Sequence, residues 1–283
     1  MSRIIRAVFL HTVIKLQAMK RLLKKGIRFV AVILAVAVFP WFFPVSSKQV
    51  CAESWEVLSA YTTYFDEKQA GRSENIRIAA MLINGITLQA YGDFSFNQTV
   101  GRRTAEAGFQ QAKIISGGEY VIGTGGGVCQ VSTTLYNAAL KSGLCVVEFH
   151  PHSLQVGYVA PSRDAMVSTQ SDLKLYNPYA HAVRICTSVQ NGTLRVQFLS
   201  KEKKQNLRYE ICSNILAEIA PPPPIVKDGE KDDILRESKN GVKSEAYLEI
   251  YRGDALLSRK RLRIDEYRPI QGIIVKKMPA ESD

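Results

Sequence analysis

A cysteine follows a run of glycines and directly precedes a predicted helix. Gly125, Gly126 and Gly127 lead through Val128 to Cys129, where the helical pattern begins. A thiol in the first turn of a helix is unusually acidic, because the helix dipole and the free N–H groups favour the thiolate. The thiolate is the nucleophilic form, and the same N–H groups are suited to holding an oxyanion. Cys129 is therefore the first candidate for a catalytic residue.

A cysteine nucleophile needs a base and a group that orients the base. Two histidines, His150 and His152, follow the predicted helix. We prefer His152, because His150 fits a surface position at a strand end equally well. Asp164 comes twelve positions after His152, a separation that allows strand, turn and neighbouring strand to bring a carboxylate beside the imidazole. The sequence predicts Cys129 as nucleophile, His152 as base and Asp164 as the orienting residue.

Seven residues around this cysteine are predicted to contact a substrate. The glycines lack side chains, so a substrate carbonyl can approach the backbone, and the polar residues lie beside the thiol or share helix faces. A solvated helix face explains the polar residues equally well. The seven residues are Gly125, Gly126, Gly127, Gln130, Ser132, Tyr136 and Asn137.

Other interpretations of the same segment stay open. Cys129 also fits a packed residue at a helix start, and a glycine loop before a helix is typical of a phosphate cradle. Cys129, His150 and His152 are also residue types that bind zinc. However, the Lys-Ser/Thr pair of a Walker loop is missing, and no C-x-x-C or H-E-x-x-H spacing is present. We therefore predict neither a metal nor a cofactor.

The elements that must position these residues are a helix and several strands. The apolar pattern predicts a helix over 130–142 and a strand over 144–150, and Asn191-Gly192 predicts a hairpin. Residues 53–65 also resemble a helix. The expected fold class is α+β, with a cysteine-bearing helix packed on a small antiparallel sheet. The order cysteine, histidine, aspartate is the one seen in papain-like and transglutaminase-like folds.

The first fifty residues have the pattern of an export segment. Eight basic residues fall within residues 1–28, which we predict to be a cytoplasmic basic region, and no acidic residue precedes Glu53. Residues 29–47 are predicted to be a signal peptide or a membrane anchor, and both remain open. The chain starts at Met1 or at Met19. Either way we expect an extracytoplasmic protein, anchored to the membrane by this segment or secreted to the cell wall.

Charge and cysteine content narrow the function classes further. The net charge is +11, but only about +3 remains outside the N-terminal basic region, which gives no indication of nucleic-acid binding. Four other cysteines, Cys51, Cys145, Cys186 and Cys212, can pair in an oxidising compartment, and the sequence leaves the pairing open. Cys145 lies in an apolar run and is predicted to be buried. A disulfide-linked structural protein is thus a further interpretation.

Composition divides the exported part of the chain. Residues 50–219 are predicted to form the α+β domain. Residues 220–233 contain four consecutive prolines and are predicted to be a stiff linker. Residues 234–283 alternate as a small antiparallel sheet does, and we expect a β appendage.

Six stretches between about 80 and 200 form long motifs. They are FSFNQTVGRRTAEAGFQQAKII, GGGVCQVSTTLYNAALKSGL, HPHS, VGYV, RDAMVS and DLKLYNP. These motifs resemble the VanW family, named for an accessory gene in some vancomycin-resistance clusters. The resemblance implies a bacterial cell-envelope protein, exported or membrane-anchored. It covers Phe94, Phe96, Asn97, Gly101, Gly125, Gly126, Gly127, Cys129, Gln130, Ser132, Thr133, Thr134, Tyr136, Asn137, His152, Ser153, Asp164 and Asn177.

Two positions depart from the family pattern. Ser162 and Met166 stand where the family usually has Gly and Thr, and they flank Asp164. Residues 234–283 faintly resemble the G5-like β modules that often accompany the family. Residues and resemblance together predict a thiol-dependent acyl hydrolase or transferase for cell-wall peptides or peptidoglycan. The alternative is a non-catalytic peptidoglycan-binding or scaffold protein linked to glycopeptide resistance.

Overall fold

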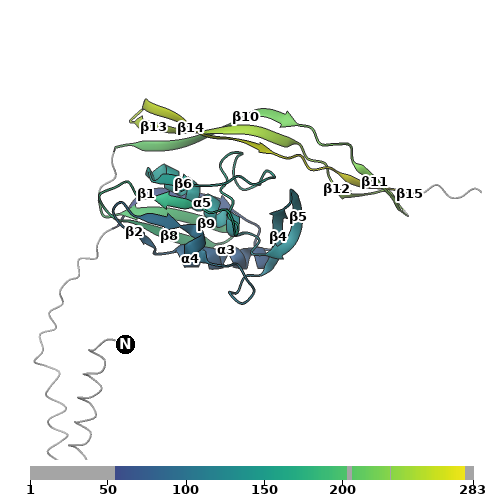
Figure 1. Ribbon diagram of the computed structural model, residues 1–283, viewed down its shortest axis with the longest axis horizontal. Coiled ribbons are helices and arrows are strands. Elements are labelled where there is room, and N and C mark those ends of the chain that lie inside the picture. Colours follow the sequence, from purple (N-terminus) through teal and green to yellow (C-terminus); the bar gives the residue numbers. More distant parts are fainter. Residues whose placement is uncertain (1–54, 203–205, 230, 278–283) are drawn as a thin grey trace, which may run out of the picture. The chain divides into compact units, whose positions relative to one another are not determined.

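The computed structural model describes residues 55–202, 206–229 and 231–277 (Figure 1). The predicted basic region, 1–28, and the apolar segment, 29–47, lie outside these residues, as does Cys51. Within the described ranges, no helix is both long and apolar enough to span a membrane. The fold is α+β, and nearly all strand pairs are antiparallel.

Each of the described helices contributes buried side chains to the core. Their bounds are α3 (Ala70–Ile83), α4 (Phe96–Val100) and α5 (Val128–Ser142). Gly143 ends α5 in the left-handed conformation, with φ of 78°. Its N–H and that of Leu144 return to carbonyls in the last turn, so the end of the helix is satisfied internally.

The largest sheet of this part has four strands. Their order is β1 (Glu56–Tyr64), β9 (Thr193–Ser200), β8 (Val183–Gln190) and β2 (Thr87–Leu88). The hairpin predicted at Asn191-Gly192 joins β8 to β9, and both turn residues have positive φ, as a type I′ turn requires. The helix expected over 53–65 is wrong, because these residues pair with β9 as strand β1. The threonines and tyrosines of this stretch favour an extended chain once a partner strand is available.

Two small sheets complete the region around α5. One contains β3 (Asp93–Ser95), β7 (Lys174–Tyr176) and β6 (Cys145–Glu148), and the other is the hairpin of β4 (Gln111–Ser116) and β5 (Glu119–Thr124).

Two further sheets follow toward the C-terminus. The first contains β10 (Arg208–Ile219), β13 (Gly241–Arg252) and β14 (Ala255–Tyr267), and the second contains β11 (Ile225–Gly229), β15 (Ile273–Lys277) and β12 (Asp233–Arg236). β10 precedes the proline run, yet it pairs along its length with β13, which follows that run. The sheet is therefore built from both sides of the predicted linker, and part of that linker forms β11.

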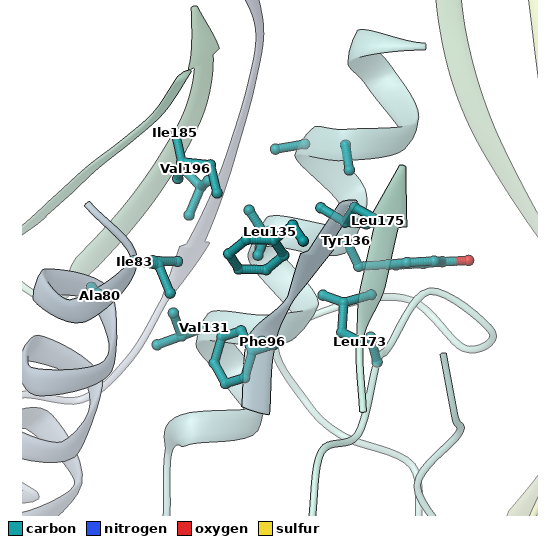
Figure 2. Packing of buried hydrophobic residues seen from close by; sticks show 14 of the residues in the cluster. Ala80, Ile83, Phe96, Val131, Leu135, Tyr136, Leu173, Leu175, Ile185 and Val196 are labelled. Carbon is teal, nitrogen blue, oxygen red and sulfur yellow. The ribbon is translucent and has the colours of Figure 1, made fainter. Parts of the chain in front are cut away.

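The centre of the core is α5 (Figure 2). All of its residues except Cys129 and Lys141 are buried. Figure 2 shows Val131 and Leu135 pointing toward Ile83 of α3, while Tyr136 points away from that helix. A helix that is buried on all sides must satisfy its polar side chains internally. The partly exposed residues of α5 are Cys129, in its first turn, and Lys141, in its last.

Candidate active site

The glycine loop brings the start of α5 into contact with neighbouring backbone. Gly127 occupies the cap position with φ of 109°, and a Cβ there would lie 3.0 Å from the Arg72 side chain. A Cβ on Gly126 would lie 2.6 Å from the carbonyl oxygen of Lys113, and one on Gly125 would lie 3.0 Å from Cβ of Arg103. These glycines line the cleft, but their missing side chains make room for this chain's own residues. The expected room for a substrate carbonyl at Gly126 and Gly127 is therefore corrected.

Cys129 is the second residue of α5 and is half-buried. Its Sγ lies 3.4 Å from the Val167 carbonyl oxygen, and the His152 imidazole is near enough to affect the pKa of the thiol. Burial alone would raise the pKa of the thiol. The hydrogen bond and positive charge of His152, together with the charge of Arg103, lower the pKa below its ordinary value of 9.0. The arrangement favours a thiolate paired with an imidazolium.

His152 is buried between the thiol and a carboxylate. Its Nδ1 lies 2.6 Å from Oδ2 of Asp164, which leaves Nε2 for the thiol. Burial would lower the pKa of this imidazole, but the hydrogen bonds to Asp164 and Cys129 raise it to about 9. The structure thus brings together the three residues that the sequence predicts as nucleophile, base and orienting group.

Asp164 is completely buried beneath His152. Its carboxylate accepts both the backbone N–H of His152, at 2.7 Å, and the ring Nδ1–H. The Tyr267 hydroxyl donates to its other oxygen, and the Arg263 guanidinium lies 3.9 Å away. Burial opposes ionisation, but these donors and the charges of His152 and Arg263 lower the pKa of Asp164. The carboxylate is thus held charged and in one orientation.

Known proteins match the segment that carries these three residues. Residues 71–199 match the family model described as VanW like protein. Residues 71–199 are named the VanW-like domain for this similarity. The YoaR protein of Bacillus subtilis (strain 168) is 38% identical to it over 159 residues, which are 56% of this chain and 52% of YoaR.

The second relative is the vancomycin B-type resistance protein VanW of Enterococcus faecalis (strain ATCC 700802 / V583). It is 22% identical over 152 residues, which are 51% of this chain and 54% of VanW. The chain is thus related to a vancomycin-resistance protein, and it spans about half the length of the curated relatives it matches.

A solved structure also shows some likeness to the chain. The G5 domain of an IgA1 protease covers 25% of this chain and 89% of that domain, at 18% identity and a TM-score of 0.19. So low a score carries no argument, and the G5-like character of residues 234–283 stays a prediction.

A strand outside the VanW-like domain supports its buried aspartate. Arg263, Asp265 and Tyr267 alternate along β14, and all three are buried, whereas Ile264 between them is exposed. Arg263 Nη1 donates to the Asp164 carbonyl oxygen at 2.7 Å, and its Nε lies 2.5 Å from Asp265. These residues were not among those predicted from the sequence. Arg263 and Asp265 stand on either side of Ile264, and in this strand the polar side chains point inward and the apolar one outward, the reverse of the usual alternation.

Ser162, which stands where the family pattern has glycine, also contacts this strand. Ser162 has φ of 60°, in the left-handed region where glycine is favoured, and a glycine usually occupies this position in the family. Its N–H donates to the Tyr267 hydroxyl at 2.7 Å, and its Oγ lies 2.7 Å from Oγ of Ser244 on β13. These hydrogen bonds hold the serine in the strained conformation. The turn before Asp164 is therefore held in this conformation.

Three of the predicted substrate contacts in the VanW-like domain are corrected. Ser132, Tyr136 and Asn137 are fully buried, and the cleft is not lined by them. Ser132 donates to Ala165 O at 2.6 Å, and Asn137 donates to Arg163 O at 2.7 Å. The polar face of α5 thus anchors the loop that carries Asp164, instead of bordering a cleft or facing solvent.

Gln130 lines the cleft, but its side chain is already engaged. Its amide donates to Thr63 Oγ1 and to Tyr64 O, at 3.0 and 2.9 Å. Its Oε1 accepts a 2.7 Å hydrogen bond from Nη2 of Arg72. The predicted hydrogen bond from Gln130 to a substrate is therefore corrected, because this residue orients Arg72.

The remaining titratable groups give no second site. Among residues 55–202, 206–229 and 231–277, no three His, Cys, Asp or Glu residues are arranged to hold a metal ion. His150 is directed to Glu148, with 3.0 Å between Nε2 and Oε1. The four cysteines of this part have free thiols, and Cys145 is exposed, so its predicted burial is wrong.

Proposed function

We propose that the protein is a cell-envelope cysteine hydrolase or acyltransferase that acts on the peptides of the cell wall. The observation that carries the proposal is the grouping of Cys129, His152 and Asp164. His152 is hydrogen-bonded to the buried Asp164, and both the thiol and the imidazole line the cleft. The lowered pKa of Cys129 and the raised pKa of His152 support an ion pair ready for nucleophilic attack.

In the first step, Sγ of Cys129 attacks the carbonyl carbon of an amide or ester. A C–S bond forms, and the carbonyl oxygen becomes an oxyanion. The N–H of Cys129 is suited to hold that oxyanion, because among the described backbone and side-chain hydrogen bonds it has no acceptor, whereas its neighbours Val128 and Gln130 donate to Gly125 O and Gly127 O. The protonated His152 then gives its proton to the leaving amine or alcohol, the bond to that group breaks, and a thioester remains.

In the second step, the neutral His152 removes a proton from water or from an acceptor amine. The resulting nucleophile attacks the thioester, the C–S bond breaks, and Cys129 leaves as the thiolate. Asp164 holds the ring in the tautomer that presents Nε2 to the thiol, and it stabilises the imidazolium. Water as nucleophile gives hydrolysis, and an amine gives transfer.

The setting of this chemistry is part of the proposal. The basic and apolar N-terminal segments support export or anchoring in the membrane, and the relationship to a vancomycin-resistance protein supports the cell envelope. The order of the residues, with Cys129 in the first turn of a helix and then His152 and Asp164, supports a papain-like or transglutaminase-like arrangement.

The proposal is tested by incubating the full chain with peptidoglycan fragments and reading the products by mass spectrometry. We expect hydrolysed fragments, which gain one water for each bond cleaved, or transfer products with the wild type, and neither with Cys129→Ala. Cys145→Ala is the matched control, because its thiol is exposed on β6, and it should retain the activity. Turnover that survives in Cys129→Ala would overturn the mechanism. Binding of fragments without turnover by either form would favour the scaffold alternative.

A further inference from the structure

Most of the charged residues that line the cleft at Cys129 are basic. Six basic side chains line it, and the acidic residue on its wall is Glu237. The six are Arg72, Arg102, Arg103, Lys113, Arg236 and Lys239. They come from separate parts of the chain, from α3 to β12 and the segment after it. Charges of one sign gathered in a cleft create a strong potential there, which selects ligands of the opposite sign.

Arg103 lines this cleft close to Cys129. It packs against Gly125, and its charge acts on the Cys129 thiol. Its Nη1 donates to Asn97 Oδ1 at 2.9 Å and to Gly101 O at 3.0 Å, both uncharged acceptors. In the described part of the chain, no carboxylate lies within 4.0 Å of it, and Asp172 acts on it only from farther away. A half-buried guanidinium is thus fixed in place beside the thiol without a paired carboxylate.

Arg72 occupies the other side of the glycine loop. It packs against Gly127, and its Nη2 donates to Gln130 Oε1, a neutral acceptor. Its guanidinium carbon lies 6.0 Å from the centre of the Tyr158 ring. Among the described residues it also has no carboxylate within 4.0 Å. The two arginines therefore flank the start of α5, and Gly125 and Gly127 permit their close approach.

A partly buried guanidinium that is fixed by neutral groups retains N–H donors for an anion. Nε–H and one N–H of Nη2 of Arg103 are not used by the hydrogen bonds described for it. Guanidinium groups bind carboxylates in a planar, two-bonded geometry. We propose that this cleft binds peptides that carry a carboxylate close to the carbonyl attacked by Cys129, with Arg103 and Arg72 as the carboxylate-binding residues. This inference rests on the proposed function, and it specifies its substrate class.

The charge preference is measured without any turnover by alkylation of the cysteines. The full chain is treated at pH 7 and low salt with iodoacetate, an anion, or with iodoacetamide, which is neutral and similar in size. Mass spectrometry then gives both rates at Cys129 and at the exposed Cys145 of the same molecule. We expect the iodoacetate-to-iodoacetamide ratio at Cys129 to exceed that at Cys145 by about tenfold, because a cationic cleft concentrates anions. A ratio at Cys129 that is no higher overturns the inference.

Variants assign the effect to the two arginines. Arg103→Gln and Arg72→Gln should each lower the ratio at Cys129 by about threefold or more, whereas Arg103→Lys should retain most of it. Changes in thiol acidity affect both reagents alike, so they cancel in the ratio. Circular dichroism confirms that each variant is folded. An unchanged ratio in both glutamine variants overturns the assignment.

Protection by ligands identifies the anion. An N-acetylated dipeptide with a free carboxylate should protect Cys129 from iodoacetamide at a concentration about tenfold lower than the same peptide as its C-terminal amide. Equal protection by both forms, or protection by inorganic phosphate as strong as by the carboxylate peptide, overturns the substrate class. None of these measurements needs bond cleavage. A negative result would therefore rule out the carboxylate preference but would not affect the turnover assay that tests the proposed function.

Discussion

Two arginines on opposite sides of the same triad show how differently one residue type is used. Arg263 lies behind Asp164, is buried, and contacts the carboxylates of Asp265 and Asp164 at 2.5 and 3.9 Å. Arg103 lies in front, beside the Cys129 thiol, and its hydrogen-bond partners are neutral. A buried, paired charge serves structure, whereas a fixed charge without a paired carboxylate is available to a ligand. Arg263 thus has its acidic partners within the chain, and Arg103 is the arginine that the proposed substrate would contact.

The largest effect is expected at the residue that joins the two sides. Asp164→Ala removes the acceptor of His152 and Tyr267 and leaves the Arg263 guanidinium buried beside an empty position. We expect the free energy of unfolding to fall by about 3–5 kcal/mol, measured by urea unfolding. Asp93→Ala, an exposed aspartate on β3, is the control and should change it by less than about 0.5 kcal/mol. Equal effects of the two substitutions would contradict the structural role of Asp164.

The comparison of the arginines is tested directly by a pair of substitutions. Arg263→Met leaves Asp265 unpaired in the interior, so we expect a loss of about 3 kcal/mol in unfolding free energy. Arg103→Gln breaks hydrogen bonds to neutral acceptors at the cleft, and less than about 1 kcal/mol should be lost. Urea unfolding of both variants measures the two losses in unfolding free energy. If Arg103→Gln is the more destabilising, the assignment of front and back is reversed.

Tyr267→Phe removes one donor to Asp164 and leaves the N–H of Ser162 without its acceptor. Because both groups are buried, we expect a loss of about 2 kcal/mol in stability. Tyr247→Phe on β13, whose hydroxyl donates to Glu245 in a less buried position, is the matched control and should cost less than about 1 kcal/mol. Thermal melting of the two variants side by side tests this expectation, and equal shifts would show that Tyr267 contributes only as a generic tyrosine.

The smallest effect is expected for the acidity of the Cys129 thiol. The pKa of Cys129 is depressed below 9.0 and that of His152 is raised to about 9, so each group favours the charged form of the other in the wild type. His152→Gln removes the positive partner, and the thiol then needs a higher pH to ionise. We expect the iodoacetamide rate at Cys129 at pH 7 to fall by about tenfold and its midpoint to move toward 9.0. The rate at Cys145, read in the same samples, should be unchanged, and superimposable Cys129 profiles would refute the ion pair.

Sequence reasoning succeeded where the signal was local. The helix predicted over 130–142 corresponds to α5, and the Asn191-Gly192 turn lies between β8 and β9, because caps, periodicity and turn residues act over a few positions. It failed for β1, whose state is set by pairing with β9, far along the chain. For the site, residue chemistry selected Cys129, His152 and Asp164, which the structure brings together, and their catalytic roles stay a prediction.

The rest of the site could not be predicted because it depends on distant parts of the chain. Tyr267 and Arg263 contact Asp164 across separations of 103 and 99 residues, and no local pattern encodes that pairing. Ser132 and Asn137 were expected at a surface, but the loop before and after Asp164 covers them. Their hydroxyl and amide groups satisfy that loop's carbonyls, and a sequence pattern alone does not separate such a role from substrate binding.

The position of β14 in the chain has a consequence for synthesis. More than a hundred residues separate the end of α5, at Ser142, from the start of β14, at Ala255. While the polypeptide is still being made, the cysteine is already present, yet Asp164 has neither Arg263 nor Tyr267 to hold it. The contacts that hold Asp164 therefore form only after β14 has been synthesised and has packed against the loop that carries this aspartate.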